Sequence, residues 1–262
     1  MVGISASSIS PVSWPSAFLR RPTIMGWWLD KRSCEITEQL RDHFKIGTFI
    51  ETGTFRGINL KFWSYRFDYV IGVELHRRYF RETFHNLDGR INAKIVCESS
   101  SQFLEEFARN YYQNERHDIL FIYLDAHFYT SDEKKTKEDR WVVLRELKAL
   151  AGFKNCVLAI HDFNCGDGLY GLVYDGEPLN FELVKDYLAQ VNPNFSYYMN
   201  LREHCNPHTE ESIIGVEGLE PDFTTLETIR FHNTDRLKYR GILYCTPTPL
   251  DLMEFNLALL NP

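Results

Sequence analysis

The amino-acid sequence predicts an α/β fold: a Rossmann-like, doubly wound and mostly parallel sheet of seven strands with helices on both faces. Three observations support this fold class. Short, continuous apolar runs alternate with amphipathic stretches along the chain, which is the pattern of parallel strands buried on both faces. A glycine-containing turn, 51–57, directly follows the first run. Acidic residues stand at or just after the ends of five successive runs.

The expected strands are the apolar runs, which fall at 46–51, 69–74, 93–98, 119–124, 156–160, 195–199 and 241–245. The expected helices have apolar residues spaced by three or four, and they fall near 33–44, 58–65, 77–86, 101–112, 140–150 and 181–191. Ser33 and Asn180 are expected to cap the first and the last of these helices. The glycine-rich stretch 164–178 is expected to be a loop. Because strand–helix–strand units cross over with one hand, the first five strands should pair in parallel.

The length of 262 residues fits one large α/β domain. We expect residues 31–262 to form that domain, with an irregular insertion at about 201–239. Residues 1–30 contain Pro11, Pro15 and Pro22, which break any regular pattern, so they are expected to form an N-terminal arm. This arm lacks the basic start and apolar core of a signal peptide.

The net charge of −7 argues against broad nucleic-acid binding, because affinity for a phosphate backbone needs clustered Lys and Arg. No apolar run approaches the roughly 20 residues of a membrane span. Three of the six cysteines, Cys97, Cys156 and Cys245, fall inside expected strands, where a reduced thiol packs as a small apolar group. A reducing, cytoplasmic compartment is therefore expected.

The turn Glu-Thr-Gly-Thr-Phe-Arg-Gly at 51–57 has the features of a cofactor-binding turn. Gly53 and Gly57 permit positive φ and let a ligand lie against the backbone at the start of a helix. Glu74 ends the next apolar run about twenty residues later, where an acidic side chain can meet a bound ribose. These residues predict a nucleoside-bearing cofactor.

Further polar residues follow the other expected strands. The carboxyl ends of parallel strands share one edge of a sheet, and ligands bind outside that edge. We therefore expect these side chains to gather there. The set comprises Glu51, Thr52, Gly53, Thr54, Glu74, Glu98, Ser99, Ser100, Asp125, His127, His161, Asp162 and Asn164.

Four motifs together resemble those of class I S-adenosylmethionine-dependent methyltransferases, and most closely the branch of sugar and macrolide-type O-methyltransferases and their uncharacterised relatives. They are the turn 51–57, Glu74 at the next strand end, Tyr-Leu-Asp-Ala-His at 123–127 and Ile-His-Asp-Phe at 160–163. The resemblance covers about 46–165 well and the later part only in the order of strands and helices. Phe55 stands where the commoner turn has its middle glycine.

The resemblance implies S-adenosylmethionine as the cofactor and O-methylation of a hydroxyl on a small molecule or glycan as the reaction. Within the turn, the backbone near Gly53 would approach the amino-acid part of the cofactor. Glu74 would accept hydrogen bonds from the ribose, and residues 98–100 would lie near the adenine. The implied cofactor-binding set is Glu51, Thr52, Gly53, Thr54, Gly57, Glu74, Glu98, Ser99, Ser100 and Asp125.

The resemblance also implies a divalent cation such as Mg²⁺, held by Asp125, Asp162 and Asn164, since oxygen ligands suit this ion. The metal stays open, because Phe163 separates Asp162 from Asn164 where adjacent ligands are more typical. His127 and His161 are the candidate general bases, because histidine titrates near neutral pH. We prefer His127, which follows Asp125 into the expected substrate cleft, as the base; Asp125 and Asp162 complete the catalytic set.

Two alternatives remain at this point. A nicotinamide-dependent oxidoreductase would use the same turn and Glu74, although the chain lacks the G-x-G-x-x-G spacing. A non-catalytic nucleoside-binding or scaffold domain would instead use Trp27 and Trp28 of the arm as a partner contact. Neither the methyl acceptor nor the oligomeric state has a sequence signal, and a homo-oligomer stays open.

Overall fold

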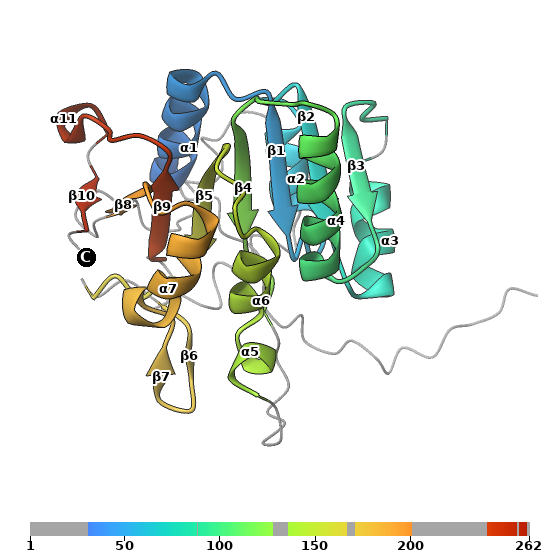
Figure 1. Ribbon diagram of the computed structural model, residues 1–262. Coiled ribbons are helices and arrows are strands. Elements are labelled where there is room, and N and C mark those ends of the chain that lie inside the picture. The colour runs from blue at the N-terminus through green and yellow to red at the C-terminus, as the bar shows by residue number, and fades with distance from the viewer. Residues whose placement is uncertain are drawn as a thin grey trace, which may run out of the picture.

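The computed structural model describes residues 31–87, 89–127, 136–166, 171–200, 240–255 and 257–260. The expected N-terminal arm and the insertion at 201–239 lie outside these residues. Within them, no helix is both long and apolar enough to cross a membrane. A mostly parallel sheet forms the middle layer of the molecule, and helices lie on both of its faces (Figure 1).

The sheet contains eight strands in the order β10-β8-β9-β5-β4-β1-β2-β3. Strands β1 to β5 pair in parallel, whereas β9 runs antiparallel to both β5 and β8. The Rossmann-like, doubly wound fold class is confirmed, with the short edge strand β10 added to the seven expected strands. The bounds are β1 (Thr48–Thr52), β2 (Tyr69–Val73), β3 (Ala93–Val96), β4 (Leu120–Leu124), β5 (Cys156–His161), β8 (Ser196–Met199), β9 (Ile242–Thr246) and β10 (Ala258–Leu259).

Amphipathic helices cover the two faces of the sheet. On one face lie α1 (Lys31–Phe44) and α2 (Ile58–Trp63), with α3 (Arg77–Asn86) beside α2. On the other face lie α4 (Ser100–Gln113), α6 (Val142–Ala149) and α7 (Phe181–Val191). The Asn180 side chain caps α7 by accepting a hydrogen bond from Leu183 N, as expected. The expected cap at Ser33 was wrong, because α1 already includes Lys31 and Ser33 lies within the helix. Two four-residue helices, α5 (Lys137–Arg140) and α11 (Leu252–Phe255), complete the set.

The stretch 164–178 is not entirely a loop as expected, because it contains a small antiparallel hairpin, β6 (Val173–Tyr174) and β7 (Glu177–Pro178). The two residues between these strands, Asp175 and Gly176, have φ of 50° and 80°. Two positive φ angles are typical of a type I′ hairpin turn, for which Asp-Gly is a favoured sequence. The dipeptide was therefore the signal for this hairpin.

Burial explains why the central strands are continuous apolar runs. Every residue of β4 and β5 is buried, because helices cover both faces of the sheet there. Cys156 and Cys245 are buried in these layers as expected, but Cys97 is exposed. The expectation for Cys97 was wrong because β3, an edge strand, ends at Val96, two residues before the expected end at 98.

The strand register sets the positions of the polar residues beyond the strand ends. Thr52 pairs with Val73 on one side and with Leu124 on the other, and Leu124 pairs with Ile160. The residues that follow these positions therefore lie along one edge of the sheet. The strand order reverses between β1 and β4, and the crevice at such a reversal is where open α/β sheets bind ligands.

Candidate active site

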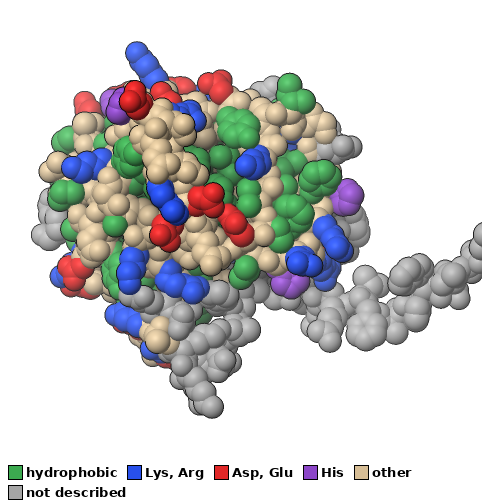
Figure 2. All heavy atoms as spheres, turned by 45° about the vertical axis from the view of Figure 1, so that its right-hand side comes forward, with side chains coloured by type: hydrophobic (Ala, Val, Ile, Leu, Met, Phe, Trp, Pro, Cys, Tyr) green, Lys and Arg blue, Asp and Glu red, His purple; other side chains and the backbone are tan. Residues whose placement is uncertain are grey.

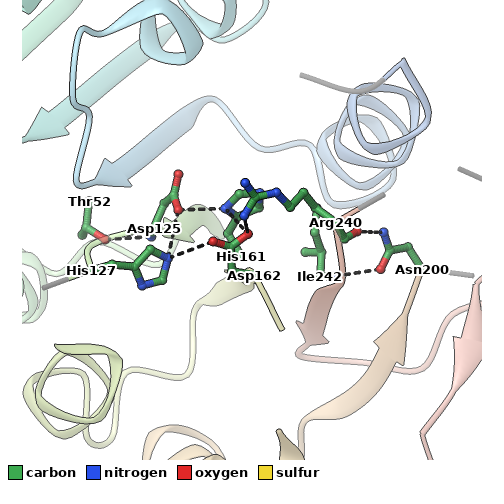
Figure 3. A network of polar contacts seen from close by, with 8 residues as sticks. All are labelled: Thr52, Asp125, His127, His161, Asp162, Asn200, Arg240 and Ile242. Carbon is green, nitrogen blue, oxygen red and sulfur yellow. Dashed lines mark hydrogen bonds and ion pairs between the residues drawn. The ribbon is translucent and has the colours of Figure 1, made fainter. Parts of the chain in front are cut away.

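Four titratable side chains from the ends of β4 and β5 meet in one cluster (Figure 3). The His161 Nδ1 atom lies 2.8 Å from Asp125 Oδ1. The His127 Nε2 atom lies 3.2 Å from the same oxygen and 3.8 Å from Asp162 Oδ2. The structure thus brings together Asp125, His127, His161 and Asp162, the four residues that the sequence predicts as catalytic.

The two histidines control the charge of Asp125. Burial by itself would raise the pKa of the Asp125 carboxyl, but the nearby His161 and His127 more than offset this and hold it below its ordinary value. Burial lowers the pKa of His127, but the carboxylates of Asp125 and Asp162 outweigh that effect and raise it overall. A negative Asp125 that stabilises a protonated His127 is the arrangement that a general base needs.

Asp162 has an unusual backbone, with a φ of 56° in the left-handed region. Two backbone hydrogen bonds hold this segment in place: Leu172 N donates to Asp162 O at 2.7 Å, and Phe163 N donates to Gly241 O at 2.8 Å. A non-glycine residue at such a φ costs of order 1–3 kcal/mol, and strain of this kind concentrates at functional sites. The fold therefore presents the Asp162 carboxylate to the cluster at an energetic cost.

Arg240 completes the cluster, and sequence reasoning missed it. Its guanidinium Nη1 forms a buried ion pair with Asp162 Oδ1. Asn200 holds the same segment, because its Nδ2 donates to Arg240 O at 2.7 Å and its Oδ1 accepts from Ile242 N at 2.7 Å (Figure 3). Arg240 stands 78 positions from Asp162 along the chain, so no local sequence pattern could have linked the two.

Glu51, the penultimate residue of β1, carries a buried carboxyl group. Asn59 Nδ2 donates to Glu51 Oε1 at 2.6 Å, whereas Glu51 Oε2 has no hydrogen-bond partner in the described structure. Burial, and to a lesser extent the nearby Asp125 and Glu74, raise the pKa of Glu51 well above its ordinary value. A buried acceptor without a partner is costly unless a ligand satisfies it. The Glu51 carboxyl is therefore suited to accept a hydrogen bond from a ligand's ammonium group, such as that of the amino-acid part of S-adenosylmethionine.

Glu74 lies at the end of β2 and holds the turn together. Its Oε2 accepts from Phe55 N at 2.8 Å, and its Oε1 accepts from His76 N at 2.7 Å. Burial raises the pKa of Glu74, and these two backbone hydrogen bonds oppose the change. Each carboxylate oxygen can accept a second hydrogen bond. The position thus fits a ribose, although Glu74 also has a structural role in the turn.

The two glycines of the turn are required by the protein itself. Gly53 has a φ of 70°, and a Cβ atom there would lie 2.6 Å from Asp125 O. Gly57 has a φ of 73°, and its Cβ would lie 2.3 Å from the Thr83 side chain. Thr52 links the same two loops, because Asp125 N donates to Thr52 Oγ1 at 3.2 Å. The glycine at 53 lets the β1 and β4 loops pack closely beside the cluster.

The three residues expected near the adenine, 98–100, lie in different surroundings. Ser99 precedes α4, its Oγ lying 3.1 Å from Ser101 Oγ, and Ser100 is buried in the first turn of the helix. Glu98 lines a hollow of about 300 Å³ between β3 and α4, together with Lys94, Phe103 and Arg116. None of the other predicted cofactor residues lines this hollow.

Figure 2 views the side of the molecule on which β3 and α3 lie, where exposed apolar side chains stand among charged ones.

The oxygen ligand set expected for Mg²⁺ does not fit this geometry well. Asn164 Oδ1 accepts a hydrogen bond from Gly166 N at 3.1 Å within its own loop. The Asp162 carboxylate is already paired with the Arg240 guanidinium. Asp125, His127 and His161 do offer ligand atoms that lie within 4.8 Å of one another. That set combines nitrogen and oxygen donors, whereas Mg²⁺ prefers oxygen.

Sequence reasoning also missed Glu146, a further buried carboxyl group. It lies on the buried side of α6 and is fully enclosed. Neither of its oxygens makes a well-formed hydrogen bond in the described structure, although the hydroxyls of Ser100 and Thr52 lie close enough to favour its charged form in part. Burial is the larger effect and raises the pKa of Glu146 to about 7. Its signal was a charged residue on the apolar side of an amphipathic helix.

No protein-family model and no curated protein matches the chain. Similar solved structures include CalS10, an amino pentose methyltransferase from Micromonospora echinaspora, at 15% identity and a TM-score of 0.33 over 52% of this chain and 51% of that one. This chain therefore spans about half the length of CalS10. An S-adenosylmethionine-dependent methyltransferase from Anabaena variabilis shows 12% identity and a TM-score of 0.40, over 82% and 83% of the two chains.

A methyltransferase from Aquifex aeolicus, also described as S-adenosylmethionine-dependent, has 12% identity and a TM-score of 0.40 over 80% of this chain and 88% of that one. Similarity at this level of identity and overlap does not identify the activity or the substrate of this chain. The function must therefore be argued from the side chains of the site.

Proposed function

We propose that this chain is an S-adenosylmethionine-dependent methyltransferase that methylates a hydroxyl group of a small molecule or glycan. One observation carries the proposal. Where the strand order reverses, the turn with the buried Glu51 carboxyl lies beside the cluster of Asp125, His127, His161 and Asp162. The turn with Glu51 suits a cationic, ribose-bearing cofactor. The cluster of Asp125, His127, His161 and Asp162 suits the removal of a proton from an acceptor.

Glu51 and Glu74 are the residues that would hold the cofactor. The Glu51 Oε2 atom, which is buried without a partner in the described structure, would accept from the ammonium group of the methionine part. The Glu74 carboxylate accepts from Phe55 N and His76 N and would also accept from the ribose hydroxyls. A cation next to Glu51 would also favour its charged form, against the burial that raises its pKa.

His127 would take the proton of the acceptor hydroxyl. When bound, S-adenosylmethionine would supply an electrophilic methyl group for the acceptor oxygen, with S-adenosylhomocysteine as the leaving group. The hydroxyl proton passes to His127, whose side chain is 8% exposed against 1% for His161. Asp125 then stabilises the protonated imidazole at 3.2 Å. Alignment of the acceptor and removal of its proton are the contributions that this chemistry asks of the protein.

The sheet itself disfavours the nicotinamide-dependent alternative. In the dinucleotide-binding arrangement the sheet continues with a further strand next to the fifth, in the order 3-2-1-4-5-6. Here the position beside β5 is taken by the antiparallel strand β9. The turn after β1 also lacks the glycine spacing of that family.

The cofactor site can be tested by calorimetry without knowing the acceptor. We expect S-adenosylhomocysteine to bind the wild-type protein and NAD not to bind. Glu51→Gln should weaken binding by at least about tenfold, because a hydrogen bond to a charged group is worth roughly 1.5–3 kcal/mol. Glu105→Gln, an exposed change on α4, is the matched control. Binding of NAD alone, or equal S-adenosylhomocysteine affinity in all three proteins, would contradict the proposal.

A further inference from the structure

The candidate site contains a positively charged side chain, the buried guanidinium of Arg240. We propose that Arg240 is the resident cation of this site: it holds Asp162 in place and excludes divalent metal ions. In this arrangement the guanidinium pairs with the Asp162 carboxylate, which the family resemblance implies as a metal ligand. The inference concerns metal binding, so it does not depend on the methyl transfer proposed above.

The contacts of the two carboxylates support this assignment. Arg240 Nη1 pairs with Asp162 Oδ1, and His161 Nδ1 lies 3.5 Å from the same oxygen. His127 Nε2 lies 3.8 Å from Asp162 Oδ2. His161 Nδ1 lies within hydrogen-bond distance of Asp125 Oδ1, at 2.8 Å. One oxygen of each carboxylate, Asp162 Oδ1 and Asp125 Oδ1, thus already has a nitrogen partner.

The charge balance points the same way. Asp125 and Asp162 contribute two carboxyl groups, and Arg240 contributes a positively charged guanidinium. A dication next to Asp162 would lie against the guanidinium in a buried site, where like charges repel strongly. A metal on Asp125, His127 and His161 would have to displace the close His161–Asp125 contact. Either position for a dication is therefore opposed by a contact that already exists.

Close backbone contacts hold the segment that carries Arg240 next to Asp162. Gly241 packs so closely on the end of β5 that a Cβ atom there would lie 1.9 Å from Phe163 O. Phe163 N donates to Gly241 O at 2.8 Å. Asn200 bonds to the backbone on both sides of Gly241, through Arg240 O and Ile242 N. These contacts fasten the start of β9 directly over Asp162.

Binding of Mn²⁺, measured by electron paramagnetic resonance and calorimetry, tests this proposal. We expect the wild-type protein to show no saturable Mn²⁺ binding below about 1 mM. Arg240→Gln should gain at least about tenfold in Mn²⁺ affinity, because it frees the buried Asp162 carboxylate as an oxygen ligand for the ion. Arg240→Lys keeps the charge and should remain without Mn²⁺. Arg66→Gln, which breaks an ion pair with Glu38 outside the site, is the control for loss of a partly buried arginine.

Saturable binding of one Mn²⁺ to the wild-type protein that is lost in Asp162→Asn would overturn the proposal. So would an Arg240→Gln protein that is folded by circular dichroism and gains no affinity. If Arg240→Gln fails to fold, Asn200→Ala loosens the same segment and should show a smaller gain. S-adenosylhomocysteine binding, measured on the same samples, separates a failure of this proposal from a failure of the proposed cofactor.

Discussion

At the scale of single residues, the site is defined by buried carboxyl groups whose surroundings differ. Asp125 stays charged because two histidines surround it. Glu51 and Glu146 lack sufficient partners, and burial raises the pKa of each. Charged groups buried without compensation are costly and persist mainly at functional sites. The neighbours of each carboxyl group, more than its residue type, therefore decide its charge.

Glu146 gives a pH-dependent prediction. Its pKa is about 7 in the folded protein against an ordinary value of 4.5, so between these values the folded state binds the additional proton. The contribution of Glu146 to stability is therefore complete below about pH 4.5 and is lost as the pH rises through 7. The full change is about 3 kcal/mol, less the effect of local relaxation.

Glu146→Gln should remove this loss, because the amide is neutral at every pH. The variant should be more stable than the wild-type protein at pH 8 and nearly equal to it at pH 4.5. Urea unfolding across this range measures the difference, with Glu105→Gln as the exposed control. A constant difference between the two proteins at all pH values would show that Glu146 does not titrate in this way.

At the scale of elements, the loops after β1 and β4 pack closely against each other. Gly53 allows Asp125 O to approach to a distance that no side chain would permit. Thr52 Oγ1 accepts from Asp125 N across the same contact. The turn after β1 therefore positions the loop that carries Asp125, and a change in one loop should alter the other.

Gly53→Ala should destabilise the protein by roughly 2–4 kcal/mol, because it adds a steric clash to the cost of a left-handed φ. Gly152→Ala is the matched control: Gly152 has a φ of 79°, but nothing lies within 4 Å of its Cβ position. The control should lose only about 1–2 kcal/mol. Chemical denaturation provides both values, and equal losses would mean that close packing at Gly53 contributes nothing.

At the scale of the whole molecule, two apolar layers hold the sheet on its opposite faces. Phe121 in β4 lies in the layer under α1 and α2, where its ring stacks on Phe49 with centroids 5.5 Å apart. Leu158 in β5 lies in the opposite layer. Because the site residues follow these same strands, the packing of both layers keeps the strand ends in register.

Phe121→Ala should therefore lower the free energy of unfolding by roughly 3–5 kcal/mol, the usual cost of a large cavity in a core. Phe84→Ala removes the same group from a side chain that is 62% exposed and should cost less than about 0.5 kcal/mol. Thermal unfolding compares the two. If both variants unfold like the wild-type protein, the layer at Phe121 is not part of the cooperative core.

Periodicity and strand-end chemistry determined much of this protein from its sequence. Alternating apolar runs predict the parallel strands, and parallel pairing alone places Glu74, Asp125 and His161 along one edge. The hairpin with Asp175 and Gly176 was missed, although its turn signal was present. These features depend on neighbours close in the chain or on strand pairing, and sequence patterns report both.

Only the tertiary structure decided which charged side chains contact one another and which are buried. Arg240 reaches Asp162 because β9 returns antiparallel beside β5, a connection that spans 78 positions. Glu146 is buried because α6 turns that side toward the sheet and α4. Electrostatic interactions depend on distance in space and on burial, and no local pattern specifies either. The sequence therefore indicated a cofactor edge, and the packing of distant segments set the charge of the site.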